Sequence, residues 1–131
     1  MEYFRIREVE TTEEEIQQRL SLANLDELST QIFNLDTPNG EEVAIGGLWG
    51  EFTLTRSTIK GGVRFTLLEC PNALSWTVTT GYPPAPEALV VHMTINRQEI
   101  KPEFNEELEE FIEDHCECLE EFLSIVKLGS M

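Results

Sequence analysis

The stretch from Pro102 to Val126 constrains the fold most, because its apolar residues recur at the spacing of one helix face. Steps of four, three, one and seven residues keep side chains on one side of a helix with 3.6 residues per turn. The apolar positions are Phe104, Leu108, Phe111, Ile112, Leu119, Phe122, Leu123 and Val126, with His115 near the middle of the same arc. The sequence therefore predicts a long amphipathic helix that needs a large apolar partner surface.

Residues 42–95 supply that surface, because their apolar and polar side chains alternate with the period of two that is typical of strands. The apolar positions define expected strands around residues 43–45, 52–54, 63–67, 74–78 and 89–95. Lys60-Gly61-Gly62 is a hairpin signal, and Pro71-Asn72 marks a second reversal. Consecutive strands joined by short turns predict an antiparallel meander with one apolar face.

The N-terminal third is expected to begin with a strand over residues 2–10 and a helix over residues 13–23. Thr12 followed by Glu15 has the spacing of a capping box at the start of that helix. Residues 24–36 fit both a helical and a strand pattern, and we expect a short helical piece followed by a short strand.

Together these elements predict a single α+β domain over residues 1–131, with residues 129–131 as a frayed tail. A meander of five to six strands, including the N-terminal strand, would carry a short N-terminal helical segment and the long C-terminal helix across one face. The order of elements resembles the helix-grip arrangement. That resemblance implies a sheet that often curls to leave a ligand cavity, although this chain is short for one.

The charge balance is strongly acidic, with 25 acidic against 9 basic residues and a formal net charge of −16. This balance disfavours contact with nucleic acid or anionic membranes, which requires clustered Lys and Arg. The odd number of cysteines, three, argues against a disulfide framework and for a reducing compartment. With no signal peptide and no apolar stretch of about 20 residues, we expect a cytoplasmic protein.

The sequence favours neither a metal site nor a catalytic site. Cys116 and Cys118 point about 160° apart on a helix, so they cannot bind one ion together. His115 and Cys118 share a face but would need two further ligands, such as Cys70 and His92, and core packing explains them more simply. No nucleophile, phosphate-binding or dinucleotide motif is present, so we predict no enzyme, metal or cofactor.

The acidic side of the C-terminal helix is the strongest functional candidate. Residues 102–128 contain ten acidic residues and one lysine, and like charges four residues apart oppose helix formation slightly. The predicted partner-binding residues are Glu106, Glu110, Glu113, Asp114, Glu117, Glu120 and Glu121, together with Tyr82 in a proline-rich loop. This ridge predicts steering toward a basic partner surface.

The leading hypothesis is therefore a non-enzymatic protein-interaction domain: an adaptor, assembly factor, inhibitor or immunity-type protein that binds a basic protein. One alternative is an inhibitor that mimics nucleic acid. The other is a small-molecule-binding protein with a pocket between the sheet and the C-terminal helix, for which Trp49 would be a wall residue instead of a core residue. A homodimer through an open sheet edge is also compatible with the pattern.

Overall fold

The structure, a computed structural model, describes residues 1–47, 49–81 and 87–129, with side chains of the last helix as far as Leu123. Within this part of the chain, seven strands form one antiparallel sheet in the order β1-β7-β6-β5-β4-β3-β2. The strands are β1 (Glu2–Arg7), β2 (Ile32–Asn34), β3 (Glu42–Gly47), β4 (Gly50–Ile59), β5 (Gly62–Leu68), β6 (Ser75–Thr80) and β7 (Leu89–Thr94). The helices are α1 (Glu13–Arg19), the 3-10 turn η1 (Leu22–Asn24), α2 (Leu25–Leu28) and α3 (Pro102–Gly129).

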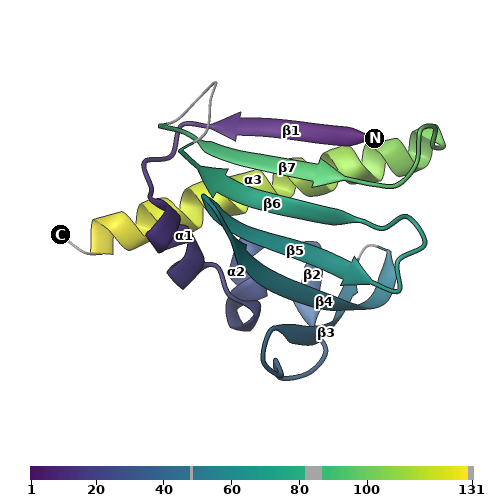
Figure 1. Ribbon diagram of the computed structural model, residues 1–131, viewed down its shortest axis with the longest axis horizontal. Coiled ribbons are helices and arrows are strands. Elements are labelled where there is room, and N and C mark those ends of the chain that lie inside the picture. The colour runs from purple at the N-terminus through teal and green to yellow at the C-terminus, as the bar shows by residue number, and fades with distance from the viewer. Residues whose placement is uncertain (48, 82–86, 130–131) are drawn as a thin grey trace.

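Helix α3 runs diagonally across one face of this sheet, and β1 forms one edge (Figure 1). This is the predicted α+β architecture, with the N-terminal strand paired to β7. The strand count exceeds the predicted five to six because residues 32–34 pair with β3 as an extra edge strand. Gly47 permits that approach, since a Cβ there would lie 2.4 Å from the carbonyl oxygen of Gln31.

The N-terminal helical segment is shorter than predicted. The hydroxyl of Thr12 accepts a hydrogen bond from the Glu15 backbone N–H at 3.1 Å, as the capping pattern indicates. The predicted helix over 13–23 is wrong at its end, because Ser21 is extended and its N–H donates to Asn24 Oδ1. That contact starts a separate 3-10 turn. The expected order of a short helix and then a short strand in residues 24–36 is confirmed as α2 and β2.

The core lies between α3 and the inner face of the sheet. The predicted stripe of α3 is fully buried where side chains are described, apart from half-buried Phe104 and Phe122. One assignment is corrected: Cys116 is buried, whereas Cys118, which was placed on the core face, is only half-buried. Cys116 lies near Arg5 and Arg7 of β1, which cover that side of α3. Cys118 lies near the Thr30 backbone.

His115 joins three elements at the centre of this core. Its Nδ1 bonds to the carbonyl oxygen of Leu28 at the end of α2, and its Nε2 accepts a hydrogen bond of 3.1 Å from Trp76 Nε1 in β6. A ring that accepts at Nε2 is neutral and carries its proton on Nδ1. Burial lowers the pKa of His115 to about 4. The interpretation of His115 as a core residue therefore agrees with its contacts.

Candidate functional site

A pocket of about 240 Å³ lies between the sheet and α3, at the end where the helix begins. The hairpin between β3 and β4 supplies Trp49, the sheet supplies its inner-face residues, and the first turn of α3 supplies Phe104. The complete lining is Trp49, Phe52, Leu67, Cys70, Pro71, Asn72, Leu74 and Phe104. Apart from Asn72 and the Cys70 thiol, these side chains are apolar or aromatic.

Trp49 is the wall of the pocket that faces the core. Its ring lies edge-on to Phe104 at 6.3 Å and to Phe111 at 5.3 Å between centroids. Phe111 in turn contacts Trp76, so the aromatic wall continues into the packed centre of the molecule. The indole Nε1 of Trp49 is buried and has no hydrogen-bond partner among the described residues. A buried donor left without an acceptor is costly, so this N–H is an exception among the buried polar groups of the described residues.

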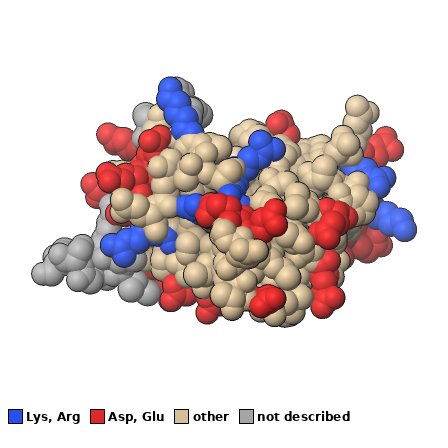
Figure 2. Space-filling model, turned by 60° about the horizontal axis from the view of Figure 1, so that its bottom comes forward, with Lys and Arg blue, Asp and Glu red and all other residues tan. Residues whose placement is uncertain are grey.

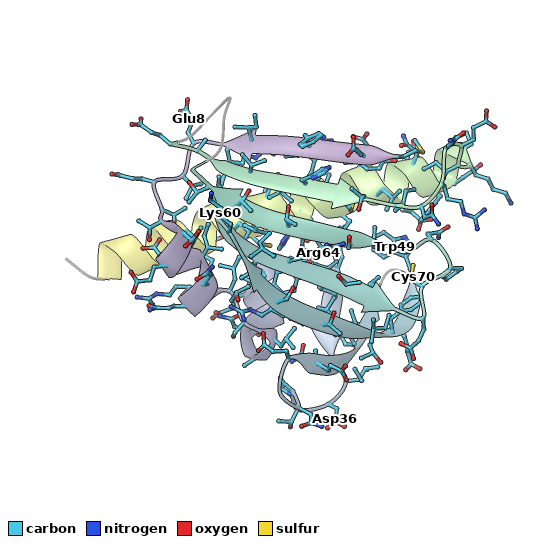
Figure 3. The ribbon with its side chains drawn as sticks, viewed as in Figure 1. Glu8, Asp36, Trp49, Lys60, Arg64 and Cys70 are labelled. Carbon is cyan, nitrogen blue, oxygen red and sulfur yellow. The ribbon has the colours of Figure 1, made fainter. Side chains whose placement is uncertain are left out.

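The loop from β5 to β6 forms the outer wall. Figure 3 shows Cys70 of this loop beside Trp49 at the same end of the sheet. Glu69 and Ala73 hold left-handed backbone conformations, with φ of 64° and 49°, which non-glycine residues rarely adopt. Tertiary bonds hold the loop in this shape: Glu69 accepts from the Thr53 N–H at 2.9 Å, and the Asn72 carbonyl accepts from the Asn96 N–H at 2.7 Å. The wall is therefore strained and fixed.

A second pocket of about 320 Å³ adjoins the first and shares Asn72 and Phe104 with it. Its other lining residues come from the segment that joins β7 to α3 and are Arg97, Glu99, Ile100 and Lys101. The two pockets are neighbours: we call the first, which is apolar, the chamber, and the second, which is lined by charged side chains, the charged mouth.

The predicted partner-binding residues on α3 fall into two groups. Glu113 pairs with Arg5 and Arg7 of β1, and Glu120 lies 3.0 Å from Arg7. The hydrogen bond from Arg5 is the main cause that lowers the pKa of Glu113. Asp114 accepts from the Ser29 hydroxyl at 2.8 Å and from the Thr30 N–H at 3.0 Å, which fixes the turn between α2 and β2. The folded chain therefore uses these three acids internally.

The remaining four residues, Glu106, Glu110, Glu117 and Glu121, are exposed. They have no ion-pair or hydrogen-bond partner in the part of the chain that the structure describes. They are spaced by four, seven and four residues and so lie along one side of α3. We call them the acidic row. Figure 2 shows one face of the molecule, on which acidic side chains lie in several separate groups among uncharged residues and a few Lys and Arg side chains. Tyr82, the other predicted contact, lies outside the described residues.

The residues weighed for a metal or catalytic site do not come together. Both ring nitrogens of His115 are occupied by core partners, and His92 stacks on Phe4 at 4.1 Å between centroids. Burial raises the pKa of the Cys116 thiol to about 11, and Cys70 lines the pocket at the far end of the sheet. Among the described residues, no group of three or more His, Cys, Asp or Glu side chains is placed to hold a metal ion. No described helix meets the length and apolarity that a membrane span requires.

The sequence predicts Trp49 as a core residue, with a position in a pocket wall as the alternative. In the structure Trp49 contacts Phe111 of the core and also lines the pocket. Sequence reasoning missed Asn72, Arg97 and Lys101, which lie in turns and connections. Their only sequence signal is the reversal at Pro71-Asn72 and the pair of cations just before the helix start.

Comparison with known proteins shows the fold and no more. No family model matches the chain, and no curated protein matches it. Among solved structures, a START superfamily protein from Mycobacterium smegmatis aligns with a TM-score of 0.58 and 10% sequence identity, covering 96% of this chain and 97% of that chain. The alignment over nearly the full length of both chains supports the helix-grip, START-like architecture.

Proposed function

We propose that this protein binds a small apolar molecule in the pocket between Trp49 and Phe104. The observation that carries the proposal is a preformed apolar chamber between sheet and helix, with the aromatic residues Trp49, Phe52 and Phe104 in its lining. Ligand sites in proteins have this composition: apolar walls with few polar groups that fix orientation.

The size and position of the pocket restrict the ligand. About 240 Å³ is slightly below the range of about 300–1,000 Å³ that holds drug-sized ligands, so the ligand is small or extends into the adjoining pocket. The centre of the interface between α3 and the sheet is solid, with Phe65, Leu108 and Phe111 at most 1% exposed. The chamber therefore lies beside the first turn of α3 and not beneath the middle of that helix.

Titration with 1-octanol, a neutral apolar probe with one polar atom, tests this function. The expected result is a saturable shift of the Trp49 indole N–H resonance in NMR spectra, with smaller shifts for Trp76. The Cys70→Phe variant fills the chamber and is expected to weaken binding at least about tenfold, because the ligand loses buried apolar contacts.

Leu68→Phe is the matched control, since Leu68 is exposed two residues away and does not line the pocket. It should bind octanol like the wild-type protein. Absence of a saturable shift at Trp49, or equal binding by the two variants, would contradict the proposal.

A second candidate function is recognition of a basic protein surface by the acidic row. The observation in its favour is that the row remains exposed and unpaired among the described residues, while Glu109, Glu113 and Glu120 on the same helix form ion pairs. Repulsion along the row opposes folding slightly, and a partner's Lys or Arg side chains would relieve it.

The row is tested by replacing Glu106, Glu110, Glu117 and Glu121 with Gln together. We expect the variant to lose partners that the wild-type protein captures at low salt and releases at high salt. A control variant with Gln at the exposed residues Glu8, Glu10, Glu27 and Glu51 changes the net charge equally and should retain them. Equal capture by both variants would refute a role of the row.

A further inference from the structure

The charged mouth of the chamber has a chemistry that the apolar chamber does not explain. Two cationic side chains, Arg97 and Lys101, and one carboxylate, Glu99, line it together with Asn72. The protein as a whole has 25 acidic and 9 basic residues, so an excess of cations at one pocket is opposite to the rest of the molecule. A pocket with this local excess favours a negatively charged group.

Arg97 is held in place for such a contact. Its Nε donates to Asn72 Oδ1 at 3.0 Å, which fixes one side of the guanidinium against the pocket wall. The neighbouring backbone is fixed too, since the Asn96 N–H donates to the Asn72 carbonyl. Both Nη atoms of Arg97 have no partner among the described residues and remain as a fork that suits two oxygens of an oxyanion.

The two cations of the mouth differ from three arginines elsewhere. Arg5, Arg7 and Arg56 each form ion pairs with glutamates of this chain. In the described part of the chain, neither Arg97 nor Lys101 has a carboxylate partner. Glu99 offsets one of the two positive charges, so folding leaves a net positive charge at the mouth.

We infer that the ligand is an amphipathic anion, with an apolar body in the chamber at Trp49 and an oxyanion head at Arg97 and Lys101. This inference rests on the proposed function, because it concerns the same site. Asn72 and Phe104 line both pockets, so the apolar body and the oxyanion head of one ligand would lie on either side of these two residues. The head is a carboxylate or a phosphate, which share the charge and the oxygen pair that Arg97 can bind.

Three probes with eight carbon atoms each separate the inference from the proposed function: 1-octanol, octanoate and octyl phosphate. Octanoate or octyl phosphate is expected to bind about tenfold more tightly than octanol, the gain of one charge-assisted hydrogen bond. Arg97→Gln with Lys101→Gln should remove that advantage, so that the anions bind no more tightly than octanol to this variant. Whichever anion binds more tightly identifies the head.

Arg19→Gln is the control, because Arg19 is exposed on α1 and its loss lowers the net charge without touching the mouth. It should leave the anion advantage intact, and added salt should reduce the advantage in the wild-type protein. If octanol binds and neither anion binds more tightly, the inference is wrong and the proposed function stands. If no probe binds, both fail.

Discussion

At the scale of single residues, His115 shows how a polar side chain is accommodated in this core. Its two ring nitrogens meet the Leu28 carbonyl and the Trp76 indole N–H, so the neutral ring has no unmet bond. Protonation would place a positive charge at a fully buried site and break the bond from Trp76. The same residue was the most plausible metal ligand by spacing alone, and its contacts explain it without a metal.

This contact pattern predicts an acid-sensitive fold. Because the pKa of His115 is about 4 in the folded state and about 6.5 when unfolded, the unfolded state binds the proton first. The contribution of the neutral His115 ring to the free energy of unfolding is therefore complete above pH 6.5 and is lost as pH falls toward 4. Between pH 7 and pH 5, His115 should lower the free energy of unfolding by about 2 kcal/mol.

Urea unfolding of the wild-type protein and of His115→Gln at several pH values measures this effect. Glutamine can keep one donor and one acceptor without titrating. The free energy of unfolding of the variant should therefore fall by about 2 kcal/mol less than that of the wild-type protein between pH 7 and pH 5. An equal pH dependence of the two proteins would contradict the assignment, as would a His115 resonance that titrates near pH 6.5.

At the scale of elements, β1 and α3 are joined by charge as well as by apolar packing. Arg5 pairs with Glu109 and Glu113, and Arg7 pairs with Glu113 and Glu120. From sequence alone the acidic face looked unexplained by folding, but these pairs explain part of it. The partners are more than 100 residues apart along the chain, so helical spacing could not reveal them.

Replacing Arg5 with Met is expected to lower the free energy of unfolding by about 1 kcal/mol at low salt, since both partners are partly exposed. The pKa of Glu113 should rise toward its ordinary value, because the Arg5 hydrogen bond is the main cause that lowers it. Arg19→Met removes an exposed arginine outside this network and should be neutral. Equal losses in the two variants would show that the network contributes no stability.

The elements themselves were largely readable from sequence because their signals are local. The apolar stripe of α3, the alternation in β3 to β7 and the turn at Gly61 each depend on residues close in the chain. The extra strand β2 was harder, since three residues carry little periodicity and pair only because Gly47 allows close approach.

At the scale of the whole molecule, the candidate site could not be predicted from the sequence, because it forms only when segments that are distant in the chain meet. Trp49, Asn72 and Phe104 come from two loops and a helix start, and none belongs to a motif. Sequence reasoning placed the ligand cavity only as an alternative and put the emphasis on α3. The geometry supports that alternative better, and it leaves the acidic row as a separate surface.

The most direct test of the central claim is the rate at which a thiol reagent modifies Cys70, with and without saturating 1-octanol. Cys70 lines the chamber, whereas half-buried Cys118 lies beside Thr30 and serves as a reference in the same molecule. A molecule that fills the chamber should slow modification of Cys70 several-fold and leave the rate at Cys118 unchanged. If octanol changes neither rate, or changes both equally, the chamber does not bind the probe and the account is wrong.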